Sequence, residues 1–251
     1  MLYEEIDKLI EEIKKIGPMR DGEEFLQSMK YNNANAIKKI TDSDDSDDEK
    51  ALRLMVLSAG CISNLIVPLP DIINKLLAEV KNPGTPLHIR CAIIGALAYF
   101  VQPNDLIPDD TKGGYGFVDD AVLINAAYSE LLYVKGKDEE LKVFTNLSEL
   151  AAGICPPDII RPLAAAVNGI TSGFEVFAKM PPQMLEDKIR QVISDPYQTN
   201  TYNSIKEVLP HPTIDGWRSY VDVKNAKGMS FEYKKGKFAA KFQDGSTILV
   251  R

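Results

Sequence analysis

Residues 86–101, which read PLHIRCAIIGALAYFV, constrain the fold more than any other part of the chain. A helix drawn through this run is apolar on almost every side, so it needs other helices packed around it. Pro86 suits the first turn of a helix, where its missing N–H costs nothing, and Pro103 disfavours a helical residue before it. We therefore expect a helix at the centre of a multi-helix bundle.

Apolar residues spaced three and four apart predict further helices on both sides of this run. The expected helices cover residues 6–16, 23–40, 47–67, 72–80, 117–135, 138–154, 157–180, 183–194 and 201–209. Proline and glycine should end several of them, with Pro68 and Pro70 closing the helix that begins at 47.

The acidic run at 41–50, TDSDDSDDEK, contains no apolar residue and is expected to be a solvated loop. Its alternating acids suggest a calcium loop, but Asp47 and Arg53 stand where such a loop needs glycine and glutamate. Ser46 followed three residues later by Glu49 fits a capping box that starts the next helix. We prefer the capping box.

The pattern changes after residue 212 to short runs rich in aromatic and β-branched residues. Strands are expected at 217–223, 229–235, 237–242 and 246–251. The predicted fold class is thus mainly α (α+β): a multi-helix bundle with a small C-terminal antiparallel β-meander. We expect a helical domain at 1–209 and a β-sheet appendage at 210–251.

A sheet this small would be marginally stable alone, so one of its faces should pack on the helical body or on a partner. Trp217, Phe231 and Tyr233 are its candidate partner-binding residues, although aromatic residues in strands more often fill a core.

Charge and cysteine usage limit the partners and the compartment. The net charge of −7 and the pI near 5.0 argue against nucleic acid and leave a protein as the expected partner. Cys61, Cys91 and Cys155 are far apart and odd in number, which fits small core residues in a reducing, cytoplasmic protein. The first residues resemble no secretory signal. The apolar runs from Leu54 and Cys91 are expected to be buried helices rather than membrane spans.

The connection that follows the central helix carries the only pattern suggestive of chemistry. Four acids, Asp105, Asp109, Asp119 and Asp120, lie among prolines and glycines between two apolar runs. Drawn together they would repel one another, which a hard divalent cation such as Mg²⁺, Mn²⁺ or Ca²⁺ would relieve. Kept apart, they would act singly as helix caps and turn residues. Both interpretations stand at this point.

From about residue 76 to 124 the chain resembles the YkvA family, a bacterial domain of unknown function. Members show a proline-initiated apolar helix with a tyrosine near its end, then Pro-x-Asp-x-x-Pro-Asp, a glycine and a paired Asp-Asp. The matching positions are Pro86, Tyr99, Pro103, Asp105, Pro108, Asp109, Gly116, Asp119 and Asp120. A YkvA-like core would span about 50–155. The loop DTKGGYGFV is more polar than the family's and one residue longer, and the family implies no established reaction.

Three functions are compatible with these features. Catalytic bases are scarce, with His88 and His211 the only histidines. The leading hypothesis is therefore a non-enzymatic binding or regulatory protein with a cation-binding acidic turn and a C-terminal sheet for a protein partner. A metal-dependent hydrolase of a phosphate-containing small molecule, with Lys112 facing the substrate, is the first alternative. The second is an acidic immunity or antitoxin protein that neutralises a basic toxin. The apolar character of typical relatives leaves peripheral membrane contact open.

Overall fold

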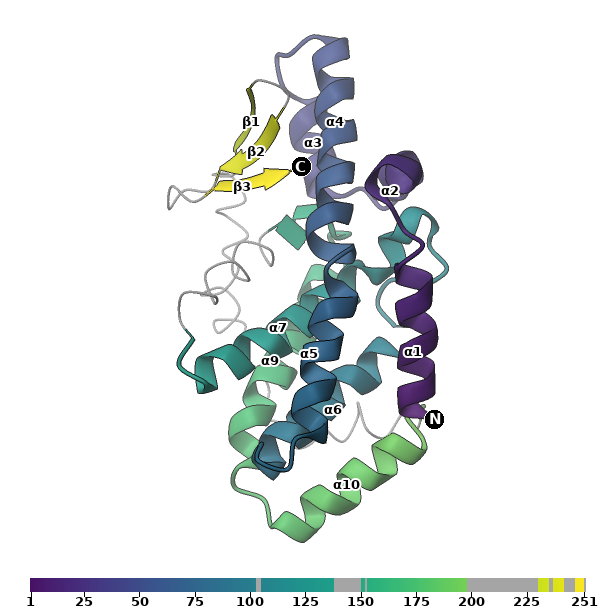
Figure 1. Cartoon of the computed structure of the whole chain (residues 1–251). Coiled ribbons are helices and arrows are strands. Elements are labelled where there is room, and N and C mark those ends of the chain that lie inside the picture. The colour runs from purple at the N-terminus through teal and green to yellow at the C-terminus, as the bar shows by residue number, and fades with distance from the viewer. Residues whose placement is uncertain are drawn as a thin grey trace.

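The computed structural model of the 251-residue chain describes residues 1–102, 105–137, 150–151 and 153–197, and the backbone of three strands between 230 and 250. The helical elements are α1 (Leu2–Ile13), α2 (Pro18–Tyr31), α3 (Asn35–Thr41), α4 (Asp47–Cys61), the π-helix η1 (Ile62–Ile66), α5 (Leu69–Lys81), α6 (Leu87–Phe100), the 3-10 helix η2 (Lys112–Phe117), α7 (Val118–Val134), α9 (Ile160–Phe177) and α10 (Pro182–Ser194). Figure 1 shows their arrangement.

Helices α6 and α7 form the centre of the bundle. Helix α6 packs against α5, α7, α9 and α10, and α7 packs against α5, α6 and α9. Every residue of α7 from Val118 to Tyr128 is buried, and so are most residues of α6. The sequence prediction of a central helix that begins after Pro86 is confirmed.

Helices α4 and α5 join into one long column that runs along the molecule (Figure 1). The helical run that begins at Asp47 ends at Ile66, just before Pro68, as predicted, but Pro70 does not end it: α5 has already begun at Leu69. The two runs share one column because Val67 and Pro68 keep helical backbone angles. Pro68 precedes the first residue of α5, and Pro70 lies in its first turn, where a proline costs no hydrogen bond.

A single helix over residues 23–40 was also the wrong prediction, since the structure has α2 and α3 there. Asn33, with a φ of 53°, adopts the left-handed conformation and separates them. The capping-box prediction is confirmed: the Glu49 N–H donates to the Ser46 hydroxyl oxygen, and the Glu49 carboxylate accepts from the Ser46 N–H at 3.1 Å. The acidic run before α4 is therefore a capped helix start.

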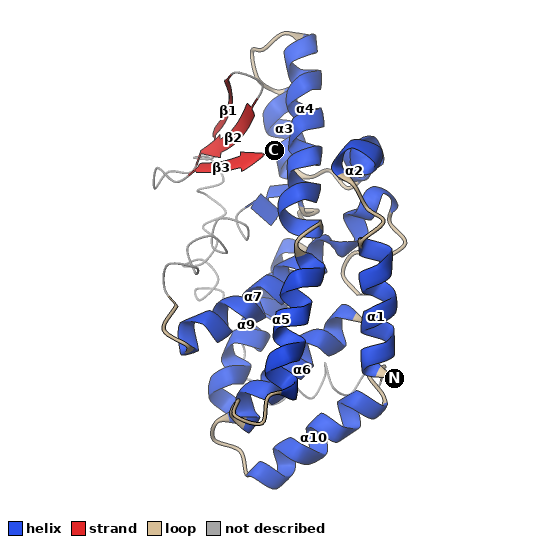
Figure 2. Cartoon of the chain, viewed as in Figure 1, coloured by secondary structure: helices blue, strands red, loops and turns tan. Residues whose placement is uncertain are grey.

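The predicted α+β class with a C-terminal β-meander is corrected to a helical fold. The part of the chain with described side chains is 76% helical and contains no β-strand. Beyond it, the backbone pairs three short strands, β1 (Ser230–Lys234), β2 (Lys237–Lys241) and β3 (Thr247–Val250), antiparallel in the order β1-β2-β3, with β3 near α4 (Figure 2). Alternation over four or five residues specifies the pairing of neighbouring strands and does not by itself make a sheet stable.

Several predictions fall outside the described residues: most of the helix at 138–154, the helix at 201–209, the strand at 217–223 and the domain boundary at 210. One helical run, Asp47–Lys81, is long and apolar enough to cross a membrane by length and composition. Half of its most apolar stretch is buried inside the protein.

Candidate metal centre

The acidic connection folds against the ends of the two central helices. Tyr99 lies in the last turn of α6, and Asp119 and Asp120 lie in the first turn of α7. Between them, the turn that carries Asp105 and Asp109 leads into η2. A β-carbon on Gly116 would lie only 2.6 Å from the carbonyl oxygen of Pro108 and 2.8 Å from the Asp109 backbone. Glycine at 116 therefore lets the two halves of the connection touch.

Three of the four acids converge. Asp105, Asp109 and Asp120 each offer a carboxylate oxygen, and these three oxygens all lie within 4.8 Å of one another. They come from two parts of the chain, the turn after α6 and the start of α7. The second sequence interpretation, in which the acids act singly and stay apart, does not describe these three.

Asp119 has a different environment from the other three acids. Its Oδ2 accepts hydrogen bonds from the Tyr99 hydroxyl at 2.8 Å and from the Ile107 N–H at 3.3 Å. The Tyr99 hydroxyl in turn accepts from the Leu106 N–H at 3.3 Å. Asp119 thus fixes the turn to both central helices.

Most oxygens of the cluster are buried without a hydrogen-bond partner among the described residues. These are both oxygens of Asp105 and Asp120 and the Oδ1 atoms of Asp109 and Asp119. Asp120 has no exposed surface at all, so water does not compensate its carboxylate. An unpartnered buried polar group costs about 1–3 kcal/mol, and more if it is charged. The unpartnered Asp120 carboxylate therefore indicates a missing ligand or bound protons.

The pKa values show the same imbalance. Burial, followed by the charges of Asp119 and Asp109, raises the pKa of Asp105 to about 9. Burial and the charge of Asp119 raise the pKa of Asp109 to about 7. Burial and the other three acids raise the pKa of Asp120 well above its usual value. Two ionised carboxylates have no proton to donate, so Asp109 and Asp120 could form a hydrogen bond to each other only if one of them were protonated.

The hydrogen bonds of Asp119 moderate its own pKa. Burial raises it to about 6, while the Tyr99 hydroxyl and the Ile107 N–H oppose the rise. Burial and the charge of Asp119 in turn raise the pKa of Tyr99. The Tyr99 hydroxyl therefore stays protonated and remains a hydrogen-bond donor.

No lysine or arginine among the described residues forms an ion pair with any of the four acids. The side chain of Lys112, the nearest basic residue in the sequence, is exposed, and its backbone oxygen accepts a hydrogen bond from Ser28. Two carboxylates about 4 Å apart repel by roughly 1 kcal/mol in water and roughly 4 kcal/mol at an effective dielectric constant of 20. The cluster therefore needs protons or a metal ion to balance its charge.

The remaining residues singled out in the sequence lie in several places. Pro86 precedes α6 as its N-cap, and Pro108 and Gly116 form the close approach described above. Phe231 and Tyr233 lie on β1, where they pair with Ala240 and Phe238; their side chains, like Pro103 and Trp217, lie outside the description.

Sequence reasoning missed the residues of α2 that contact η2, among them Phe25 and Ser28. Ser28 and Lys112, which form a hydrogen bond, are 84 positions apart in the sequence, and no local sequence signal marks such a contact.

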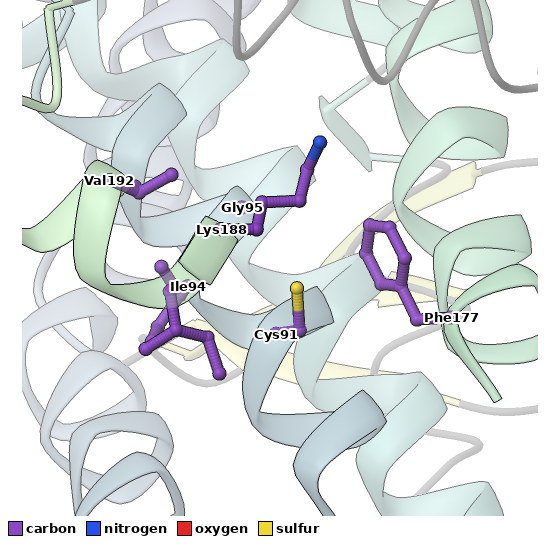
Figure 3. A pocket seen from close by; sticks show the side chains of 7 residues that line it. Cys91, Ile94, Gly95, Phe177, Lys188 and Val192 are labelled. Carbon is purple, nitrogen blue, oxygen red and sulfur yellow. The ribbon is translucent and has the colours of Figure 1, made fainter. Parts of the chain in front are cut away.

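A separate pocket lies between α6, α9 and α10. It is lined by Cys91, Ile94, Gly95, Phe177, Lys188, Ile189 and Val192 (Figure 3). Its volume of about 10 Å³ is at the lower limit for a single water molecule. Cys91 is buried there, and burial raises its pKa to about 11, as expected for a core cysteine rather than a nucleophile. None of the four acids lines this pocket.

Comparison with known proteins gives one finding. Residues 89–126 match a family described as a protein of unknown function (DUF1232). The matched segment runs from the first turn of α6 into α7 and contains all four acids. No curated protein and no solved structure matches the chain.

Proposed function

We propose that this is a non-enzymatic binding protein whose acidic centre holds one hard divalent cation, Mg²⁺, Mn²⁺ or Ca²⁺. We also propose that the matched segment is the centre of a YkvA-like domain over about residues 50–155. The cation would join the turn after α6 to the start of α7. Asp105, Asp109 and Asp120 would supply three carboxylate oxygens, and Asp119 would position the turn through Tyr99 and Ile107.

One observation carries this proposal. The fully buried Asp120 carboxylate, with no hydrogen-bond partner for either oxygen among the described residues, lies in the same cluster as Asp105 and Asp109. Hard divalent cations prefer carboxylate oxygens and can retain several waters, so three protein ligands are enough for Mg²⁺ or Mn²⁺.

A thermal melt of chelator-treated protein, with and without each cation, tests the proposal. A ligand at a hundred times its dissociation constant adds about 2.7 kcal/mol, which corresponds to a rise of about 5–10 °C in a chain of this size. Asp109→Asn and Asp120→Asn should abolish the rise. Asp110→Asn is the matched control, because Asp110 is exposed and follows Asp109 directly. An unchanged melting temperature with all three cations would refute the proposal.

The hydrolase alternative has no specific support among the described residues. Phosphoryl transfer relies on arginine or lysine to stabilise the transferred group, and no described basic side chain pairs with the acids. The immunity or antitoxin alternative rests on the net charge of −7 and the short C-terminal strands. A protein partner and a cytoplasmic location remain predictions from composition.

A further inference from the structure

Helix α2 rests on the short segment that links two of the proposed ligands. Residues 112–117 form η2, which lies between Asp109 and Asp120 in the chain. Helix α2 packs against η2 and against α4. The segment is therefore in a position to pass on any change in the spacing of the two carboxylates.

The approach between η2 and α2 is close enough to exclude a side chain. Gly113 has a φ of 71°, a conformation that glycine adopts without strain. A β-carbon placed on it would lie 2.2 Å from the backbone nitrogen of Phe25 and 2.8 Å from the carbonyl carbon of Glu24. The two backbones are thus in direct contact, and a change in the path of η2 must move one of them.

Two side-chain contacts complete this interface. The Ser28 hydroxyl donates to the Lys112 carbonyl oxygen at 3.1 Å. The rings of Phe25 and Tyr115 meet edge to face, with centroids 5.3 Å apart and an interplanar angle of 77°. Ser28 is nearly buried, and Phe25 and Tyr115 have no exposed surface, so separation of α2 from η2 would expose two aromatic rings.

The other end of η2 is fixed to the acidic centre. Gly116 lies against the Pro108 carbonyl oxygen and the Asp109 backbone, and the Tyr115 hydroxyl donates to the Ile154 carbonyl oxygen at 2.6 Å. Because interfaces this tightly packed rearrange as units rather than deform gradually, the centre and the α2 interface should respond together.

We infer that cation binding at the acidic centre and the seating of α2 on η2 form one coupled equilibrium, in which the cation holds α2 in place. This inference rests on the proposed function and adds a regulatory role to the same site. If α2 separates from the bundle and η2 moves with it away from Asp109, the cation is released. By reciprocity, loss of the cation loosens α2.

Hydrogen exchange of the full chain, followed by mass spectrometry with Mn²⁺ or with chelator, tests this inference. At Mn²⁺ a hundred times its dissociation constant, an opening that releases the ion becomes about a hundredfold rarer. Amides of α2 should then exchange up to about a hundredfold more slowly, while those of α10 should not change. Asp120→Asn should remove the effect, and Asp110→Asn should retain it.

The converse experiment perturbs the contact between η2 and α2 and measures cation affinity. Gly113→Ala places a methyl group against the Phe25 backbone, so it should weaken Mn²⁺ binding about tenfold or more by calorimetry, within the usual range of coupling factors. Gly17→Ala, where no atom lies within 4 Å of the added carbon, should bind Mn²⁺ as the unmodified chain does.

Two outcomes would overturn the inference, and they differ. If calorimetry shows Mn²⁺ binding that depends on Asp120 while α2 exchanges at the same rate with and without the ion, the coupling is wrong and the proposed function stands. If Mn²⁺ does not bind at all, both are wrong.

Discussion

Replacement of Gly116 with alanine should disturb the acidic centre without removing any acid. The added methyl group would lie 2.6 Å from the Pro108 carbonyl oxygen and 2.8 Å from two backbone atoms of Asp109. Contacts below 3 Å to backbone atoms cannot be relieved by rotating a side chain, so the turn at 108–109 must move. The Asp109 carboxylate would move with it.

The size of the effect follows from the overpacked contact. Forcing a methyl group into a filled site costs about 1–3 kcal/mol. For a chain of this length each kcal/mol lowers the melting temperature by about 2–4 °C, so Gly116→Ala should melt about 2–12 °C lower. Because a displaced Asp109 no longer meets Asp105 and Asp120, the variant should also lose most of the stabilisation by Mn²⁺.

Thermal melts of Gly116→Ala and Gly153→Ala, each with chelator and with Mn²⁺, make the comparison. Gly153 lies in a helical segment and is buried, but no atom of the described residues lies within 4 Å of its added β-carbon. Alanine there should be neutral or stabilise by up to about 1 kcal/mol, and the Mn²⁺ response should persist. If Gly116→Ala melts like the unmodified chain and keeps its Mn²⁺ response, the close approach at 116 does not position the centre.

Three further predictions concern single residues. In chelator-treated protein the free energy of unfolding should fall by at least about 1.4 kcal/mol per pH unit as the pH rises from 5 to 7. The reason is that folded Asp105, with its pKa raised to about 9, retains a proton that the unfolded chain releases. Urea titrations of Asp105→Asn should show a shallower fall, and a free energy of unfolding that rises with pH would contradict the burial argument. Tyr99→Phe, which removes the hydroxyl that donates to Asp119, should lower the free energy of unfolding by about 1–3 kcal/mol in the same titrations, and an unchanged value would show that the bond is replaced. Ser46→Ala should cost about 1 kcal/mol by loss of the capping box with Glu49, and no loss in a thermal melt would refute that role.

Local sequence signals predicted the helical body well. The central helix, the start of α4 and the range of α7 all follow from signals that lie within a few residues: Pro86 before α6, Ser46 with Glu49, and an apolar run to Val134. Where the prediction failed, a local signal was outweighed. Asn33 interrupted a periodic pattern by adopting the left-handed conformation, and Pro70 lies in the first turn of α5 instead of ending a helix.

The acidic centre was only half predictable. The sequence placed four acids around one connection, but their convergence depends on the close approach at Gly116, which joins residues that have no periodic relation. The different environment of Asp119 depends on Tyr99 from the preceding helix. The contact between η2 and α2 could not be predicted at all, since it joins residues far apart in the chain.

Anomalous diffraction from crystals of the Mn²⁺-bound protein would test the central claim most directly. Data collected above and below the manganese absorption edge locate the ion without reference to any assumed site. If the three carboxylates bind the cation, a single strong peak should lie between Asp105, Asp109 and Asp120, within about 2.6 Å of one oxygen from each. Fully occupied Mn²⁺ elsewhere on the protein, with no peak among these three carboxylates, would contradict the claim and would leave protons to balance the charge of the acidic centre.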